Sequence, residues 1–206
     1  MSEDDARAAV EAIVGTAYMD RLARFVARVT EESERQNLVA KPTLAAIWER
    51  HVLDSAQLLP LAGDQPGLWA DVGTGAGFPG MIIALATDRP VGLIEPRRMR
   101  AEFLASTLAD EGLSNRVTVY QAKVERVVAL SAAVISARAV ASLSELLQST
   151  AHIASMDTLY LLPKGQSATT EVNEARRRFE GLFHVEQSIT SPEAGIVSAR
   201  HVRQRR

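Results

Sequence analysis

Hydrophobic positions in this chain first follow a helical spacing, and later fall into short apolar runs separated by helical stretches. One apolar stripe in the first part has members at i, i+3, i+4 and i+7; they are Leu22, Phe25, Val26 and Val29. Side chains at these spacings share one face of an α-helix, so the pattern predicts a helix over residues 4–34.

A second helix is expected over residues 44–59. Thr43 is a favourable residue for capping a helix N-terminus, and Pro60 is expected to stop the helix because it lacks a backbone N–H. Residues 63–67 include two glycines and a proline, which is typical of a turn. We therefore expect residues 1–62 to form a helical cap belonging to the same domain as residues 63–206.

Short apolar runs alternate with helical stretches from residue 68 onwards. The expected strands are 68–72, 91–95, 117–120, 132–136 and 158–162, the last stopping at Pro163, with two weaker strands at about 182–187 and 196–202. The expected helices are 79–87, 98–111, 143–154 and 170–180, with a mobile loop at 165–170. This alternation predicts an α/β fold with a mostly parallel sheet of seven strands and helices on both faces.

The composition is ordinary for a globular protein, with 47% hydrophobic and 23% charged residues in a chain of 206. The absence of cysteine excludes disulfides and thiolate metal sites. No apolar run approaches the roughly 18 residues of a membrane span. The first residues are acidic, unlike a signal peptide, so we expect a cytoplasmic protein.

The net charge of −2 does not by itself indicate nucleic-acid binding. Arginines nevertheless cluster at residues 97–100, 176–178 and 200–206. Such clusters can bind phosphates, but each one alone is more typical of a solvated helix face or a frayed tail.

A glycine-rich turn follows the first expected strand. Asp71 ends that strand, and Gly73, Gly75 and Gly77 come next at alternate positions. Glycine permits positive φ and lets a ligand approach the backbone, and the N-terminus of the following helix offers free N–H groups. We therefore expect Asp71 and these glycines to bind a nucleotide-like cofactor, the alternative being a simple strand-to-helix connection.

The spacing differs from the dinucleotide fingerprint G-x-G-x-x-G, since Phe78 occupies the place of the third glycine. A second acid, Glu95, ends the next expected strand. It lies at the distance along the chain that is typical of an acid binding ribose hydroxyls. The turn and the acid together favour a nucleoside cofactor held at the carboxyl ends of the strands.

Other candidate residues also follow strands. Val124 and Glu125 come after the third strand, and Glu125 could equally be a surface charge. Arg138 lies between alanines after the fourth strand, where it either binds a ligand or forms a salt bridge to Asp71 or Glu95. Lys164 follows the fifth strand and could be no more than a loop charge.

The expected cap helix carries His51, Asp54 and Ser55 on one face. A metal site lacks partners because the other histidines are scattered, and one helix face cannot arrange a Ser-His-Asp relay with an oxyanion hole. The simpler alternative is that these polar groups form hydrogen bonds with the sheet domain.

Taken together, these motifs resemble one family. The matching segments are 37–39, 47–55, 71–80, 93–95, 137–139 with Leu143, and 163–165. Over about residues 35–180 the chain resembles the bacterial small-subunit rRNA guanine-N7 methyltransferases, the RsmG family, also called GidB. The short acidic N-terminal helices and the arginine tail depart from the family pattern.

The resemblance implies a Rossmann-like class I S-adenosylmethionine methyltransferase fold. It implies a cytoplasmic enzyme that methylates N7 of one guanine in the decoding-region loop of 16S rRNA within the small ribosomal subunit. The implied contacts to the cofactor, S-adenosyl-L-methionine, are Gly73, Phe78, Val124, Glu125 and Arg138, with Glu95 near the ribose. No metal and no membrane partner are expected, and we expect a monomer.

Guanine N7 has an in-plane lone pair and no proton to lose, so no residue is required as a general base. We expect His51, Arg138 and Lys164 to hold the RNA or orient the pocket, with Asn37 and Asp54 as further substrate contacts. Two alternatives are a nicotinamide-dependent oxidoreductase and a non-catalytic ribosome-assembly factor that binds RNA. Since A-form RNA hides N7 in its deep groove, the target base should be unpaired or displaced.

Overall fold

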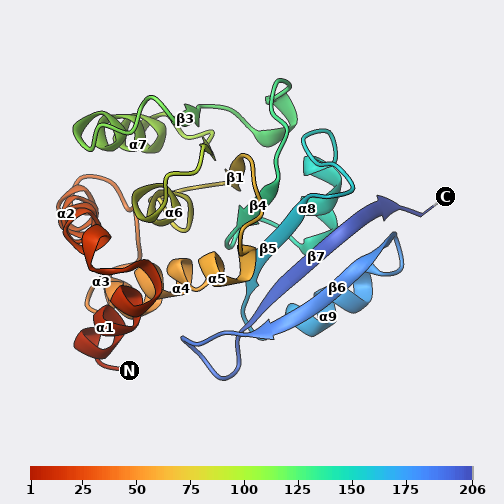
Figure 1. The fold of residues 1–206 in the computed structure, drawn as a ribbon, viewed down its shortest axis with the longest axis horizontal. Coiled ribbons are helices and arrows are strands. Elements are labelled where there is room, and N and C mark those ends of the chain that lie inside the picture. The colour runs from red at the N-terminus through yellow and green to blue at the C-terminus, as the bar shows by residue number, and fades with distance from the viewer. Residues whose placement is uncertain (206) are drawn as a thin grey trace.

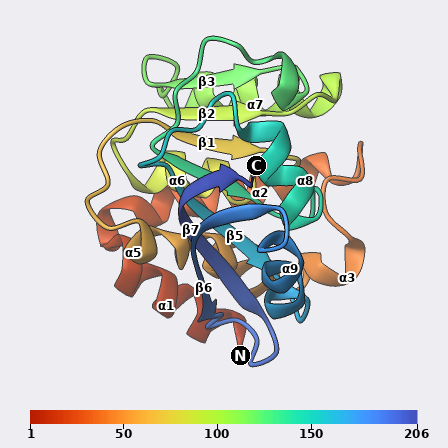
Figure 2. The same ribbon diagram turned by 90° about the vertical axis from the view of Figure 1, so that its right-hand side faces the viewer.

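The computed structural model describes residues 1–205 and has one central sheet. Arg206, the last residue of the arginine tail, lies outside the described residues. The strands are β1 (Trp69–Val72), β2 (Val91–Ile94), β3 (Val117–Tyr120), β4 (Val134–Ala137), β5 (Leu159–Lys164), β6 (Phe179–Gln187) and β7 (Gly195–Gln204). The sheet is seven-stranded in the order β3-β2-β1-β4-β5-β7-β6, with only β7 antiparallel to its neighbours (Figure 2). The predicted fold class is confirmed.

Helices cover both faces of the sheet (Figure 1). The helical elements before β1 are α1 (Glu3–Val14), α2 (Thr16–Glu32), α3 (Lys41–Leu44), the π-helical η1 (Trp48–Leu53), α4 (Asp54–Ala56) and α5 (Leu58–Ala62). Those that follow are α6 (Gly80–Ala86), α7 (Arg98–Asp110), the 3₁₀ turn η2 (Val124–Arg126), α8 (Leu143–Thr150) and α9 (Ala168–Ala175).

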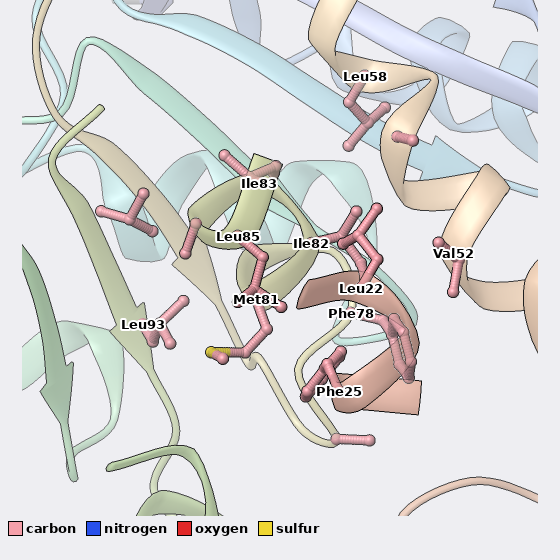
Figure 3. Packing of buried hydrophobic residues seen from close by; sticks show 14 of the residues in the cluster. Leu22, Phe25, Val52, Leu58, Phe78, Met81, Ile82, Ile83, Leu85 and Leu93 are labelled. Atoms are coloured by element: carbon pink, nitrogen blue, oxygen red, sulfur yellow. The ribbon is translucent and has the colours of Figure 1, made fainter. Parts of the chain in front are cut away.

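Alternate residues of each buried strand enter two separate hydrophobic cores. In β1, Trp69 packs with α6, α7 and the N-terminal helices, whereas Ala70 and Val72 pack with α8 and α9. Figure 3 shows α6 inside the first core, with Met81 near Leu93 of β2 and with Phe25 of α2 on its other side. Since residues of 1–62 and of the sheet share this core, we propose that the two ranges fold as one unit.

The N-terminal region is two helices, so the prediction of a single helix over 4–34 was wrong. The chain breaks at Gly15, whose φ of 87° lies outside the helical range. Ser2 caps α1 with a reciprocal capping box to Asp5, and α1 packs against η1. The apolar stripe of α2 was recognised correctly, because Leu22, Phe25 and Val29 are all buried.

The prediction of one helix over 44–59 was also wrong. The segment is divided into α3, η1, α4 and α5, and Thr43 lies within α3 and donates to Ala40 O at 2.8 Å. Pro60 lies inside α5 rather than stopping it. The position is permissive because it falls in the first turn of α5, where a backbone N–H has no helical partner to lose.

Differences near the C-terminus have a similar origin. β5 continues through Pro163 to Lys164, because by then the chain has passed its pairing with β4 and pairs only with β7. α9 begins at Ala168, so the expected loop 165–170 is shorter than predicted. None of the helices in residues 1–205 has both the length and the apolar composition needed to span a membrane.

Phe25 is the side chain that most directly joins the N-terminal helices to the turn after β1. It is fully buried, and its ring centroid lies 5.5 Å from that of Phe78 and 6.4 Å from that of Phe103. We expect Phe25→Ala to lower the free energy of unfolding by about 3–5 kcal/mol, measured by denaturant titration. Leu182→Ala, at a position 56% exposed, is the control and should change it by at most about 0.5 kcal/mol. Equal effects of the two substitutions would contradict this packing.

Candidate active site

The glycine turn between β1 and α6 is tied to the end of β2. The N–H groups of Gly73 and Thr74 both donate to Ile94 O, at 2.8 and 3.1 Å. Gly73 and Gly75 have φ values of 68° and 59°, which is the left-handed region that favours glycine. The backbone therefore curls over the carboxyl end of β2.

Asp71 lies beneath this turn and not in the crevice above it. Its side chain is fully buried, with Oδ2 accepting from Gly80 N at 3.0 Å and Oδ1 accepting from Ser136 Oγ at 2.6 Å. A Cβ on Gly80 would lie 2.6 Å from Oδ2, so the start of α6 can approach this closely only as glycine. The Asp71 carboxylate therefore holds the turn from below, and its contact with the cofactor stays a prediction.

Burial raises the pKa of Asp71 to about 6, although the hydrogen bonds from Ser136 and Gly80 favour the ionised form and oppose the rise. The carboxylate serves as an acceptor for its buried neighbours in spite of this desolvation.

Glu95 faces the turn, as predicted. Its Oε2 accepts from Gly75 N at 2.8 Å and its Oε1 accepts from Arg97 N at 2.8 Å, and the residue is only 3% exposed. Each carboxylate oxygen has a second lone pair, so ribose hydroxyls could share the carboxylate with these amides.

The surface above the turn is partly open. A Cβ placed on Gly75 would meet nothing closer than Arg100 Nη1 at 3.6 Å, so this backbone is accessible to a ligand. Over Gly73, by contrast, Val140 Cγ2 lies 2.5 Å from where a Cβ would be, and Val140 is 45% exposed. Val140 therefore covers the first glycine, and the only sequence signal for this role was its place after a strand, beside Arg138.

The third glycine and Phe78 turn toward the N-terminal helices. A Cβ on Gly77 would lie 2.5 Å from Phe25 Cζ, and Phe78 is only 4% exposed. These two residues form the contact between the turn and the cap, and their contact with the cofactor stays a prediction. Beyond β3, Val124 is buried and could supply an apolar wall, and Glu125 is exposed.

Arg138 joins the end of β4 to the cap. Its Nη1 donates to Asp54 Oδ2 at 3.0 Å and to Arg50 O at 3.1 Å, and its Nη2 donates to His51 Nδ1 at 2.8 Å. The salt bridge considered from the sequence thus exists, but its partner is Asp54 and not Asp71 or Glu95. His51 and Asp54 of the cap therefore do form hydrogen bonds with the sheet domain, which is the simpler interpretation that the sequence allowed for them.

His51 is neutral in this arrangement. Because Nδ1 accepts from Arg138, Nε2 carries the proton and donates to Thr43 Oγ1 at 2.9 Å. Burial, together with the positive charges of Arg138 and Arg50, lowers the pKa of His51 to about 4. The imidazole stacks on Phe78 with ring centroids 5.0 Å apart, and the Arg138 guanidinium lies over the same ring at 5.5 Å.

The Lys164 side chain is mostly buried, which argues against the alternative that it is only a loop charge. Its Nζ forms a salt bridge with Glu171 at 2.9 Å and donates to Ala141 O at 2.6 Å. It therefore fixes the connection that follows β4.

A cavity of 610 Å³ brings four of the predicted substrate residues together, namely His51, Asp54, Arg138 and Lys164. The fifth, Asn37, is not among its lining residues; it is exposed, and its main-chain O accepts from Arg100 at 3.1 Å. Within residues 1–205, no group of three or more histidine, aspartate or glutamate side chains is placed to hold a metal ion.

The strand order and the glycine turn define the class I methyltransferase fold. Solved structures agree: a methyltransferase from Geobacter sulfurreducens superposes with a TM-score of 0.59 at 18% identity over 86% of this chain and 88% of its own. An S-adenosyl-L-methionine-dependent methyltransferase described as putative, from Methanococcus maripaludis, gives 0.60 at 12% identity over 85% and 94%.

Sequence comparison gives the family. A model described as rRNA small subunit methyltransferase G (GidB) matches residues 18–202. Proteins named ribosomal RNA small subunit methyltransferase G are similar: that of Erythrobacter litoralis is 44% identical over 97% of this chain and 96% of its own. That of Novosphingobium aromaticivorans is 47% identical over 91% and 82%.

The chain belongs to the rRNA small subunit methyltransferase G family. It is a methyltransferase with S-adenosyl-L-methionine as cofactor, and the open backbone at Gly75 beside the Glu95 carboxylate fits such a nucleoside.

Asp71 predicts a specific pH dependence of stability. Its pKa is raised to about 6 from the 3.8 of an unfolded carboxyl, so between these values the folded state binds more protons than the unfolded state. The contribution of Asp71 to stability should therefore fall as pH rises from about 4 to 6, by at most about 1.4 kcal/mol per pH unit. Denaturant unfolding of the wild type and Asp71→Asn across this range measures the difference, and parallel curves would contradict it.

Arg138→Gln tests the charge acting on His51. Glutamine keeps an N–H donor but removes the positive charge, so the pKa of His51 should rise above about 4 while burial keeps it below 6.5. The imidazole resonances followed by NMR against pH give the value. Arg203→Gln, at an arginine paired with Glu180, is the control and should leave it unchanged. An unchanged His51 pKa in Arg138→Gln would exclude this electrostatic effect.

Proposed function

We propose that this protein transfers the methyl group of S-adenosyl-L-methionine to N7 of one guanine in 16S rRNA of the small ribosomal subunit. Family membership supports the substrate, since the relatives are named for small-subunit rRNA. It also argues against a nicotinamide-dependent oxidoreductase. We further propose that the protein acts in the cytoplasm, as a monomer and without a metal ion.

The observation that supports the N7 assignment is the state of three groups that line the cavity beside Arg138 and at the end of β5. His51 is a neutral acceptor held by Arg138, Asp54 is paired with Arg138, and Lys164 is paired with Glu171. None of these groups is placed as a free base, and guanine N7 requires none because it already presents a lone pair.

The cofactor supplies an electrophilic methyl group on a sulfonium. We propose that Gly73, Gly75 and Glu95 hold its nucleoside, and that Val124 and Glu125 lie beside the adenine of the cofactor. The chain's further task is alignment, since holding the reacting atoms in line can account for about 7–11 kcal/mol of a barrier. Arg138 is fixed by three hydrogen bonds and lies between the turn and the cavity, so it can orient the base without losing further side-chain freedom.

A methyl-transfer assay tests this function. Small subunits from a strain lacking the enzyme are incubated with the protein and labelled S-adenosyl-L-methionine, and the modified base is mapped. We expect label at N7 of a single guanine of 16S rRNA. Binding of the subunit with no label would instead support an assembly factor, and label at another atom would overturn the N7 assignment.

A further inference from the structure

The 610 Å³ cavity beside Arg138 has four walls drawn from distant parts of the chain. The cap supplies Thr43 to Asp54, and the connection after β4 supplies Ala139 and Ala141. The end of β5 and the turn after it, residues 163–167, supply the third wall together with Glu171 of α9. The β6–β7 connection and the start of β7, within residues 188–196, supply the fourth. Arg138 also contacts Phe78 of the glycine turn, so this end of the cavity adjoins the turn.

Two of the three carboxylates that line the cavity are committed to the protein. Asp54 accepts from Arg138 through Oδ2 and from Gln57 and Thr190 through Oδ1. Glu171 accepts from Lys164 and from Leu143 N through Oε2, and from Ser167 through Oε1. All four of these oxygens already accept hydrogen bonds, and each carboxylate is neutralised by a cation of the protein.

The third carboxylate, Glu193, is differently placed. It is exposed at the cavity, and within residues 1–205 its one hydrogen bond comes from the side-chain amide of Gln166 to Oε2. That bond leaves Oε1 open. Glu193 is thus the lining carboxylate that can accept from a ligand without breaking an ion pair.

The segment that carries Glu193 is anchored at both ends. Ile189 N donates to Gln57 Oε1 at 2.9 Å, and Thr190 Oγ1 donates to Asp54 Oδ1 at 3.0 Å, which ties it to the cap. At its other end, Gly195 N donates to Gly165 O at 3.1 Å. A carboxylate on a tethered segment is already in position before a ligand arrives, so less ordering has to occur on binding.

We propose that Glu193 reads the Watson–Crick edge of the target guanine and that Gln166 positions it, an inference that rests on the proposed function. When N7 of the guanine faces the methyl donor, the O6/N7 edge of the base is turned toward the cofactor. The protein must then identify guanine at its other edge, by the N1–H and N2 amino donors. One carboxylate accepts from both. Adenine presents an acceptor at N1 and would place it against the carboxylate, where no hydrogen bond can form.

The same carboxylate suits the chemistry. Methylation at N7 makes the purine ring cationic, and a negative group at the opposite edge of the base stabilises the charge as it develops. One side chain would therefore both recognise guanine and stabilise the positive charge that develops on the purine ring.

The test compares guanine with inosine, which lacks only the N2 amino group, at the target position of reconstituted small subunits. Single-turnover methyl transfer is measured for the wild type, Glu193→Ala, Gln166→Ala and the control Glu186→Gln, an exposed acid of β6 outside the cavity. We expect the wild type and the control to prefer guanine roughly tenfold or more, as for a hydrogen bond to a charged group. Glu193→Ala should lose that preference and Gln166→Ala should reduce it, with cofactor affinity unchanged in all.

The outcomes separate the two proposals. A wild type that methylates N7 normally, with Glu193→Ala retaining its preference for guanine over inosine, overturns the role of Glu193 alone. Equal slowing of both substrates by Glu193→Ala also overturns it, because the carboxylate would then act without reading the amino group. A wild type that transfers no methyl group to N7 of the rRNA overturns the proposed function itself.

Discussion

The buried carboxylate of Asp71 is the contact on which the methyltransferase site depends. Through Gly80 N and Ser136 Oγ it connects the end of β1 with the start of α6 and with β4. Trp69 Nε1 donates to the same serine oxygen at 2.9 Å, so the chain of bonds continues into the core. Desolvation opposes this arrangement, as the raised pKa of Asp71 shows, but the bonds of Asp71 hold the turn from below, and its backbone at Gly75 stays open to a ligand.

The N-terminal helices are part of the site rather than an addition to it. Arg138 from β4 is held by Asp54 and His51, and its guanidinium and the His51 imidazole both cover Phe78 from the glycine turn. Phe25 of α2 packs on the same ring. The cap, the turn and the residue that follows β4 therefore meet at Phe78, and the 610 Å³ cavity opens directly beside that junction.

Much of this could be predicted from the sequence, for reasons visible in particular residues. The strands are short apolar runs ended by glycine or charge, and the position of Glu95 at a strand end placed it beside the turn. The failures concern residues whose role is set by tertiary contacts. Gly15 separates two helices where the sequence predicted one, and Pro60 falls where a helix tolerates it.

The partner of Arg138 could not be predicted because it comes from a residue 84 positions away in the cap, and no local pattern encodes that pairing. The free state of Glu193 is equally a tertiary property. Arg138 and Lys164, which line the same cavity, pair with Asp54 and Glu171 and not with Glu193. The spacing of acidic residues along the chain does not reveal this choice of partners.

The connection after β4 serves both halves of the site. Arg138 at its start is fixed by the cap, and Ala141 near its end is fixed through its carbonyl by Lys164, so Ala139 and Val140 lie between two anchored points. Val140 covers Gly73, and Ala139 has a φ of 55°, which is unfavourable for a residue with a Cβ. A ligand can reach Gly73 only if the Val140 side chain moves, and the two anchors hold the backbone on either side of it. Because its neighbour Ala139 lines the cavity beside Arg138, this one connection borders both the glycine turn and the cavity.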